Sequence, residues 1–391
     1  MTDNFKPVRE ADNYLVYGSP LIGDEEIQEV HNCLASGWLG TGPKVAQFEA
    51  DFSAYKNAPY VAALNSCTAA LHLSMLAAGL GPGDEVITTP LTFCATINAI
   101  IHAGATPVLA DIDPRTHNIN PELISECITE RTKAILPVHF AGLPCDMDTI
   151  MKIAKDNSLA VIEDCAHAIE SEYNNQKTGT IGDFGCFSFY VTKNVVTGEG
   201  GMVIARNKES IDRIKILGLH GLSKDAWKRF GDEGYKHYQV VDSGFKYNMM
   251  DIQAAIGIHQ LKRIDDNWLR RQQIWAYYND NLKGLPIILP PTPSENMKHA
   301  YHLYSILIDE SQSGFSRDEF LRRIDKHNIG VGVHYISIPE HKYYREKFNW
   351  KPEDYPVSYD VGRKTVSLPL SAKLTDIDVE DVIEAVRRIC A

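Results

Sequence analysis

Short apolar segments alternate with longer amphipathic segments from about residue 60 to residue 206. The apolar segments predict strands at 60–64, 85–88, 107–111, 134–139 and 160–163. Apolar residues at helical spacing predict helices between them, at 69–78, 94–103 and 147–156. Strands without a polar face that alternate with helices are typical of a mostly parallel sheet with helices on both sides.

The pattern changes near residue 184. Two successive strands are expected at 184–190 and 201–206, around a polar loop, and helices at 251–263 and 265–282. Four prolines between 286 and 293 then mark a linker or a strand edge. A smaller α/β pattern follows, with strands at 302–308 and 331–336 and helices at 317–327 and 377–389. We therefore expect an α/β protein with a large domain, 1–265 including the N-terminal segment, and a small C-terminal α/β domain, 266–391.

Composition narrows the class of protein. The chain has 391 residues, 44% hydrophobic and 23% charged, which is ordinary for a globular protein. Its net charge, 39 − 51 = −12, argues against a general binder of nucleic acid or anionic membranes, although one local basic pocket is compatible with it. We expect no membrane span and no signal peptide. Eight cysteines without a CxxC pair predict reduced thiols in a cytoplasmic protein and no zinc site.

Three segments that follow predicted strands could carry chemistry. The first, 65–69, lies between a strand and a helix, where free N–H groups and hydroxyls bind anions. On its own, N-capping by Ser66 or Thr68 explains it more simply. The second, 163–167, contains Asp164 at a strand end, where a carboxylate can hold a cationic partner or cap a helix.

The third segment runs from 188 to 194 and precedes a glycine-rich loop at 198–201. Lys193 stands just beyond a buried strand, where lost solvation lowers the pKa of a lysine and frees its amine as a nucleophile. Most lysines are solvated surface side chains, so each segment alone is weak evidence. Their order matches the needs of pyridoxal phosphate (PLP), which requires an anion site, a carboxylate for the ring nitrogen and a lysine for the aldehyde.

The chain resembles the DegT/StrS family of PLP-dependent nucleotide-sugar aminotransferases, and the resemblance extends over nearly its whole length. The resemblance implies the fold-type-I architecture of PLP-dependent transferases and a homodimer with shared active sites. The motifs that carry it are Ser36-Gly37-Trp38 with Gly42-Pro43, NSCTAALHL at 65–73, GPGDEVITTPLTFCAT at 81–96, VHFAGLPCDM at 138–147, IEDCAHA at 162–168, SFYVTKNVVTGEGG at 188–201, LHGLSKDAW at 219–227, GFKYNMMDIQAAIG at 244–257, VGVHYI at 331–336 and SLPL at 367–370.

The resemblance also implies a role for each matched residue. Lys193 would form the Schiff base with PLP and shuttle the proton. Asp164 would face the pyridinium nitrogen, and His167 would lie near the phenolic oxygen. Phe93 would stack on the pyridine ring, since a flat aromatic face suits an electron-poor ring. The expected phosphate ligands are Ser188, Cys67, Thr68 and Ala69.

Two departures from the family pattern affect the phosphate site. Many relatives have glycine where Cys67 stands, and glycine allows a closer approach of the phosphate. Many relatives also read G-[YF]-N-x-R where this chain reads Gly244-Phe245-Lys246-Tyr247-Asn248. We therefore expect Lys246 or Asn248 to reach the phosphate in the neighbouring subunit.

The Lys193-Asn194 pair, the Gly-Glu-Gly-Gly loop and the GFKYN segment resemble the branch that aminates C4 of UDP-linked 4-keto sugars. The expected reaction moves an amino group from L-glutamate, leaving 2-oxoglutarate, to C4 of a nucleotide-linked keto-sugar in cell-surface polysaccharide or related amino-sugar biosynthesis. The expected substrate contacts are His220, His334 and Tyr335, and the candidate cations for the diphosphate are Lys246, Lys224, Lys228 and Arg229.

Four alternatives remain at this stage. One is a sugar 3-aminotransferase, a branch that more often has Lys-Pro and a Gly-Asp-Gly-Gly loop. A PLP-dependent dehydratase acting at C3 is disfavoured by Lys193, because such relatives have histidine there. A non-enzymatic regulator of the same fold is disfavoured by the presence of Lys193, Asp164 and Ser188 together. A nicotinamide oxidoreductase is disfavoured because no GxGxxG follows an early strand.

Overall fold

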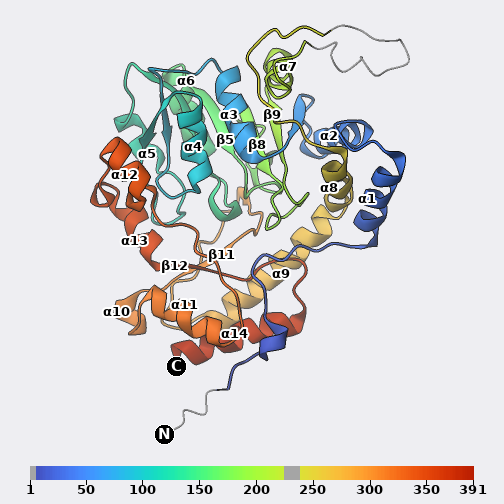
Figure 1. Cartoon of the computed structure of the whole chain (residues 1–391). Coiled ribbons are helices and arrows are strands. Elements are labelled where there is room, and N and C mark those ends of the chain that lie inside the picture. The colour runs from blue at the N-terminus through green and yellow to red at the C-terminus, as the bar shows by residue number, and fades with distance from the viewer. Residues whose placement is uncertain (1–5, 224–237) are drawn as a thin grey trace.

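The computed structural model describes residues 6–223 and 238–391, and a seven-stranded sheet lies at its centre (Figure 1). The strand order is β1-β9-β8-β5-β4-β2-β3. Pairing is parallel from β8 to β3, whereas β9 runs antiparallel to both β1 and β8. The mostly parallel α/β sheet predicted from the sequence is therefore confirmed. The strands are β1 Val61–Leu64, β2 Glu85–Thr88, β3 Thr106–Leu109, β4 Thr132–Leu136, β5 Ala160–Asp164, β8 Phe184–Ser188 and β9 Gly201–Ala205.

Alternate residues of the central strands pack into two different helical layers. Cys186 of β8 belongs to the core beneath one layer, and the next residue, Phe187, belongs to the core on the other side. This alternation is the two-residue period of a strand, and it explains why the strands read as continuous apolar runs. One layer contains α3 Cys67–Ala77, α4 Cys94–His102 and α7 Lys208–Leu217. The other contains α2 Pro43–Lys56, α5 Pro121–Glu126, α6 Met147–Asp156 and α8 Asp251–Lys262.

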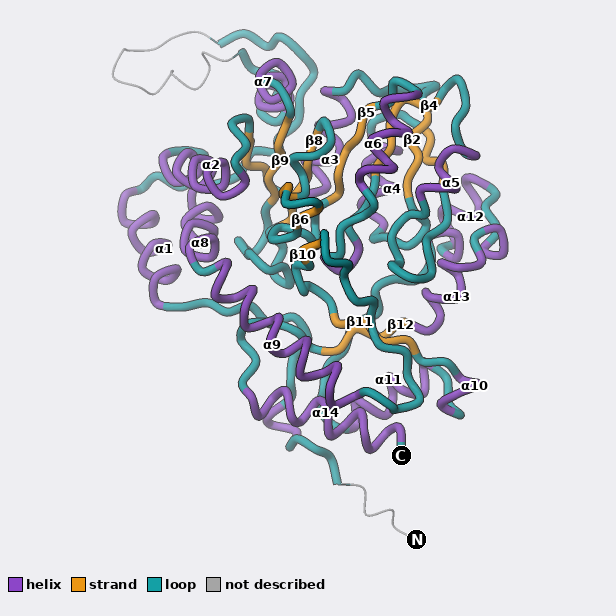
Figure 2. The backbone as a smooth tube through the Cα atoms, turned by 180° about the vertical axis from the view of Figure 1, so that it is seen from behind, coloured by secondary structure: helices purple, strands orange, loops and turns teal. Residues whose placement is uncertain are grey.

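A long helix, α9 (Ile264–Leu282), leads from the sheet to a smaller C-terminal unit (Figure 1). There β11 (Tyr304–Leu307) pairs antiparallel with β12 (Thr365–Leu368). Figure 2 shows these two strands between the large sheet and α11 and α14. The remaining elements are α10 Glu310–Ser313, α11 Arg317–Lys326, α12 Lys342–Phe348, α13 Pro356–Lys364, α14 Asp376–Cys390, and the short strands β6 Glu172–Tyr173, β7 Gln176–Lys177 and β10 Met297–Lys298.

The N-terminal segment packs on the C-terminal unit before the chain reaches the sheet. Leu15 is part of the apolar cluster that includes Phe320, and it forms a β-bridge with Ile329. Arg9 forms ion pairs with Asp378 and Asp381 of α14, at 2.8 and 2.7 Å. Only then does α1 (24–36) bring the chain to α8. The domain boundary near 265 stays a prediction, and these contacts join the start of the chain to the C-terminal side.

One predicted strand was wrong. The segment 331–336 is not a strand, because only Gly332 bridges Ser367 and the chain then leaves the sheet. The ring of His334 occupies the space beside Gly332, where an added Cβ would lie 2.6 Å from it. No element was assigned from the sequence before residue 60, where α1 and α2 lie; in α1 only Glu26 and Cys33 are buried, which leaves little apolar pattern to detect.

Two expectations from composition concern the cysteines and the membrane. All eight cysteines are free thiols, in agreement with the prediction of reduced cysteines. Among the helices within residues 6–223 and 238–391, none combines the length and the apolarity that crossing a bilayer requires.

A buried carboxylate from a distant helix holds the start of α2. Asp251 of α8 accepts hydrogen bonds from the N–H groups of Gly42, Lys44 and Val45, at 2.7, 3.1 and 3.0 Å. The first N–H groups of a helix have no partner inside the helix, and Gly42 at the N-cap has no side chain to offer. Asp251 therefore supplies both the acceptor and the negative charge that this helix end favours.

This contact predicts that Asp251→Ala lowers the free energy of unfolding. One buried and two partly buried N–H groups would lose their carboxylate acceptor, and we expect a loss of about 1–3 kcal/mol. Denaturant unfolding followed by circular dichroism measures it, with the exposed Asp280→Ala on α9 as the control. Equal unfolding midpoints for the two variants would contradict the proposed capping role of Asp251.

Candidate active site

The carboxyl ends of β5 and β8 meet at a cavity of about 650 Å³. β5 ends at Asp164 and β8 ends at Ser188, and parallel pairing brings these ends to the same edge of the sheet. The N-terminus of α3 and the start of α4 form further walls. The C-terminal unit contributes residues 332–335, so the cavity lies between the two parts of the chain.

Asp164 presents a buried carboxylate to this cavity, with 4% of the residue exposed. Burial raises the pKa of this carboxyl, and two neutral hydrogen bonds oppose that effect. The N–H of Ala166 donates to Oδ1 at 3.1 Å and the hydroxyl of Thr96 donates to Oδ2 at 2.9 Å. The carboxylate makes no ion pair with any described residue. A cationic ligand atom in the cavity would therefore be strongly favoured beside it.

Lys193 lies on the cavity wall in the turn that follows β8, where its backbone N–H donates to the carbonyl of Tyr190 at 2.8 Å. Burial lowers its pKa to about 8, against the opposing influence of Cys67 and Asp164. Within the described ranges, its amine has no hydrogen-bond or ion-pair partner. A lysine that is partly desolvated and unpaired is a nucleophile and a base near neutral pH.

The turn between β1 and α3 provides an anion site at the opposite wall. The Ser66 hydroxyl accepts a hydrogen bond from the Ala69 N–H at 3.1 Å and so caps α3. The N–H groups of Cys67 and Thr68 have no acceptor among the described residues and remain available to a ligand. Gly201 allows this arrangement, because an added Cβ would lie 2.4 Å from the carbonyl carbon of Ser66.

Aromatic side chains close the remaining walls. His167 Nδ1 accepts a hydrogen bond from the Ala141 N–H at 3.3 Å, and its Nε2 lies 3.1 Å from the Tyr335 hydroxyl. A neutral His167 ring therefore carries its proton on Nε2 and donates it to Tyr335. Phe93 is 57% exposed at the rim, and its ring lies 5.8 Å from that of Tyr335. These rings suit a flat ligand between Phe93 and the sheet edge.

The structure brings together most of the predicted site residues, and others lie elsewhere. Cys67, Thr68, Phe93, Asp164, His167, Ser188, Lys193, His334 and Tyr335 all line the cavity, and Ala69 is the next residue along α3. Lys246 and His220 are exposed and do not line it in the same chain. Asn248 donates to the Thr41 hydroxyl at 2.6 Å instead. The expected contact of Lys246 or Asn248 with a neighbouring subunit and that of His220 with the substrate stay predictions. Lys224, Lys228 and Arg229 lie outside the described residues.

Sequence reasoning missed several cavity residues. Thr96 contacts Asp164 across 68 residues of sequence, and Tyr17 reaches the cavity from the N-terminal segment. Ser367 stood out only as part of the SLPL motif, but its hydroxyl lies 2.9 Å from His334 Nδ1 and orients that ring. The local signal for Thr96 was its position in the first turn of a helix that follows a buried strand.

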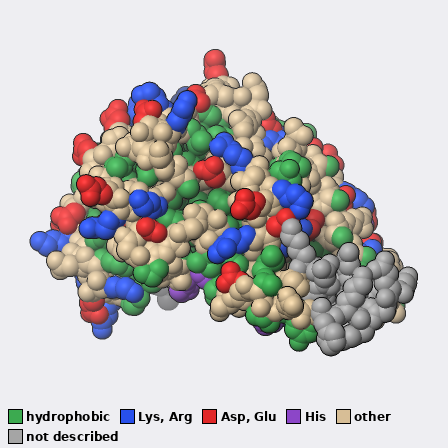
Figure 3. Space-filling view, turned by 90° about the horizontal axis from the view of Figure 1, so that it is seen from above, with side chains coloured by type: hydrophobic (Ala, Val, Ile, Leu, Met, Phe, Trp, Pro, Cys, Tyr) green, Lys and Arg blue, Asp and Glu red, His purple; other side chains and the backbone are tan. Residues whose placement is uncertain are grey.

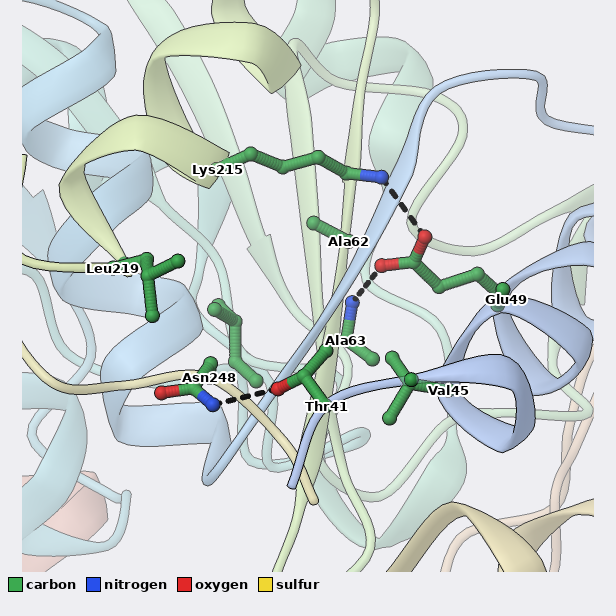
Figure 4. Close-up of a pocket in the computed structure, with 12 residues that line it drawn as sticks. Thr41, Val45, Glu49, Ala62, Ala63, Lys215, Leu219 and Asn248 are labelled. Atoms are coloured by element: carbon green, nitrogen blue, oxygen red, sulfur yellow. Dashed lines mark hydrogen bonds and ion pairs between the residues drawn. The ribbon is translucent and has the colours of Figure 1, made fainter. Parts of the chain in front are cut away.

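A second cavity, of about 290 Å³, lies between α2, β1 and α7 (Figure 4). Its walls are mostly aliphatic, and its one ion pair joins Glu49 to Lys215 at 2.8 Å. Glu49 also accepts a hydrogen bond from the Ala63 N–H at 2.8 Å and so protects the free edge of β1. Since the charged groups of this cavity are already paired, we assign the chemistry to the cavity at Lys193.

A buried cluster of His139, Glu163 and Cys165 has the composition of a metal site. Its hydrogen bonds argue for a structural role instead. Glu163 accepts from the N–H groups of Gly179, Ile181 and Gly182, and it lies 3.0 Å from His139 Nε2. His139 Nδ1 accepts from the Cys145 N–H at 3.0 Å, so both ring nitrogens are engaged.

Several known proteins are similar to this chain over nearly its whole length. The model of the DegT/DnrJ/EryC1/StrS aminotransferase family matches residues 20–387. The spore coat polysaccharide biosynthesis protein SpsC of Bacillus subtilis (strain 168) is 49% identical over 383 residues, which cover 98% of each chain. The PLP form of the putative sugar aminotransferase Spr1654 from Streptococcus pneumoniae superposes with a TM-score of 0.89 at 32% identity, covering 96% of this chain and 98% of that one.

A second similar structure is that of DesI in the presence of its TDP-sugar product, with a TM-score of 0.87 and 27% identity. It covers 98% of this chain and 94% of that one. The cavity described above suits PLP: a phosphate can meet the start of α3, a protonated ring nitrogen can meet Asp164, and an aldehyde can meet Lys193.

The environment of Lys193 predicts an unusual labelling profile. Because the neutral amine reacts with acylating reagents and the ammonium does not, acylation of Lys193 in the cofactor-free protein should be half-maximal near pH 8. Peptide mass spectrometry across a pH series measures it, and the exposed Lys133 in the same digest serves as the reference. A Lys193 profile that coincides with the Lys133 profile would contradict a desolvated amine.

Proposed function

Because the chain belongs to the DegT/DnrJ/EryC1/StrS aminotransferase family, we propose that it moves an amino group from L-glutamate to C4 of a UDP-linked keto-sugar. Membership makes the protein a PLP-dependent sugar aminotransferase. The observation that carries the proposal is an unpaired amine, Lys193, and a buried carboxylate, Asp164, that face one cavity.

We propose that this chain holds PLP through the residues at the sheet edge. Asp164 would accept the proton-bearing ring nitrogen, and Phe93 would cover one ring face. The phosphate would bind the free N–H groups of Cys67 and Thr68 and the hydroxyl of Ser188. Bound PLP withdraws electrons from the carbon attached to the transferred nitrogen, which makes a proton on that carbon removable.

Lys193 is the base that this arrangement supports for moving that proton. Its pKa of about 8 lets it both accept and return a proton near neutral pH. Asp164 keeps its charge when a cation binds beside it, and the hydrogen bonds from Thr96 and Ala166 hold the carboxylate in place. His167 and Tyr335 would orient the ligand as neutral hydrogen-bonding groups. Glutamate and the keto-sugar would use the same cavity in turn.

The anionic substrates need more cations than this chain provides at the cavity. Of the described residues that line it, Lys193 alone is a lysine or arginine. Burial lowers the pKa of His334 to about 3 and that of His167 well below its usual value, so both rings are neutral. Charges of both signs are interspersed on the face seen in Figure 3. We propose that a second subunit supplies the missing groups, with the exposed Lys246 as one candidate.

Apolar side chains near the cavity and on the adjacent surface support a homodimer. Phe93 and Tyr190 at the cavity are 57% and 45% exposed. Trp38, Leu39 and Met250, next to the Asp251 contact, are 49%, 42% and 45% exposed. Large exposed apolar groups of this kind are typical of protein interfaces. A dimer that covers them would bring the residues of one chain to the site of the other.

The name of SpsC connects a relative with spore coat polysaccharide biosynthesis, and DesI was solved in the presence of a TDP-sugar product. These two proteins support a nucleotide-linked sugar in the assembly of a polysaccharide. The assignment of UDP as the nucleotide and of C4 as the aminated carbon rests on the Lys193-Asn194 pair and the GFKYN segment. The alternative is amination of a 3-keto sugar.

The regiochemistry is tested with L-glutamate and a panel of UDP-, dTDP- and GDP-linked 4-keto and 3-keto sugars. We expect amination at C4 of a UDP-linked sugar, identified by mass spectrometry and NMR. Amination of 3-keto sugars alone would overturn the C4 assignment. Turnover of dTDP-linked or GDP-linked sugars alone would overturn the assignment of UDP as the nucleotide.

Replacing the proposed base gives a second test. We expect Lys193→Ala to reduce turnover by at least about 10³-fold, because this substitution removes both the nucleophile and the base of the reaction. Borohydride reduction of the PLP-loaded wild type should place the cofactor mass on the Lys193 peptide. Lys133→Ala is the matched surface control. Wild-type turnover in Lys193→Ala, or the reduced adduct on another residue, would refute the assignment.

A further inference from the structure

The side chain next to Lys193 has no role in the reaction described above, yet it is the most connected group in its loop. The Asn194 amide nitrogen donates to Glu170 Oε2 at 2.8 Å and to the Ala300 carbonyl at 3.1 Å. Its amide oxygen lies 2.9 Å from His302 Nδ1. Two segments that are distant in sequence, at residue 170 and at residues 300–302, therefore hold the residue that follows the proposed base.

These partners fix which way the amide of Asn194 points. A carboxylate and a carbonyl can only accept hydrogen bonds, so the nitrogen of Asn194 must face Glu170 and Ala300. The oxygen then faces His302, and a neutral His302 must carry its proton on Nδ1. The protonation pattern of His302 thus follows from the orientation of Asn194.

Glu170 is itself part of a buried ion pair with Arg271 of α9. The side chains of Glu170 and Arg271 are 0% and 3% exposed. Separating the two side chains of such a pair is costly, because each would be left as an uncompensated buried charge. Glu170 and Arg271 therefore stay together. Through Glu170, Asn194 fastens the Lys193 loop to the helix that joins the sheet to the C-terminal unit.

On its other side, Asn194 connects to the rings of the cavity. The ring of His302 lies 4.5 Å from that of His167, which in turn meets the Tyr335 hydroxyl. Burial lowers the pKa of His302 and of His167 well below the usual value, and the charge of Lys193 adds to this effect. Both rings remain neutral while the neighbouring amide of Asn194 carries no charge.

We propose that Asn194 is a positioning residue for Lys193: it fixes the lysine loop to the Glu170–Arg271 pair and keeps a neutral group between Glu170 and His302. This inference rests on the proposed role of Lys193. If Asn194 acts in this way, Lys193 alone among the described cationic groups at the cavity changes its protonation near neutral pH. The titratable groups that face this region are Tyr17, Cys67, Asp164, His167, Glu170, Arg271, His299, His302, His334 and Tyr335.

The test compares the PLP-loaded wild type with a variant that keeps the hydrogen bond and moves the charge. In the double variant Asn194→Asp with Glu170→Gln, the introduced glutamine can donate to the introduced aspartate and the total charge is retained, whereas the hydrogen bond to the Ala300 carbonyl and the ion pair with Arg271 are lost. The negative charge, however, now lies beside His302 and Lys193. The readout is the pH midpoint of the visible absorbance band of the resting holoenzyme, without substrate.

We expect this midpoint to rise by roughly one pH unit, because a nearby negative charge favours the protonated form of a cation. Asn157→Asp, an exposed asparagine whose amide donates only to the Ile153 carbonyl, is the matched control and should titrate like the wild type. A purely structural role for Asn194 would change stability or turnover and leave the midpoint in place. A double variant with the wild-type midpoint would therefore overturn the proposal.

A second variant keeps the proposal testable if the double variant does not fold. His302→Gln retains a donor toward the Asn194 oxygen but cannot titrate. Since His302 is neutral in our assignment, its replacement should leave the absorbance midpoint unchanged, and a shift of about half a unit or more would refute the assignment. A failure of the proposed function gives a different result. In that case the wild type itself would lack the visible absorbance band, or borohydride would not trap the cofactor on Lys193.

Discussion

The parallel pairing of β5 with β8 is the constraint on which the site depends. Ile162, Glu163 and Asp164 lie in register with Phe184, Gly185 and Cys186, so the ends of the two strands reach the same edge of the sheet. That edge is buried under the C-terminal unit, which is why a carboxylate and an amine with altered pKa values can face one cavity. Apolar packing on both faces of the sheet holds β5 and β8 in this register, and the register brings the strand ends with their functional side chains to one edge of the sheet.

Features that depend on local pattern could be predicted from the sequence. The strands at 85–88 and 160–163 and the helix at 147–156 were predicted within about a residue of their bounds, because buried strands and amphipathic helices leave a periodic signature. Asp164 and Lys193 were singled out because each lies just beyond a predicted strand, and their proposed roles came from the order of the three segments and from the family resemblance. Their proximity then followed from the rule that parallel strands present their carboxyl ends together.

Features that depend on distant contacts could not be predicted in this way. Thr96 meets Asp164 across 68 residues, and Arg271 meets Glu170 across 101 residues. Neither pair has a local signature. The segment 331–336 was mistaken for a strand because Val331, Val333 and Tyr335 alternate as strand residues do. In the structure, Tyr335 and His334 line the cavity instead, so the apparent strand pattern reflects the ligand site.

The contact of Arg9 with Asp378 and Asp381 has a consequence for how the protein is made. These partners lie 369 and 372 residues apart, and Leu15 is buried in the same cluster as Ile389. The C-terminal core therefore cannot close until the ribosome has released the residues as far as Ile389. Contacts of such long sequence separation form slowly, so Arg9 and Leu15 stay without these partners until α14 has been synthesised.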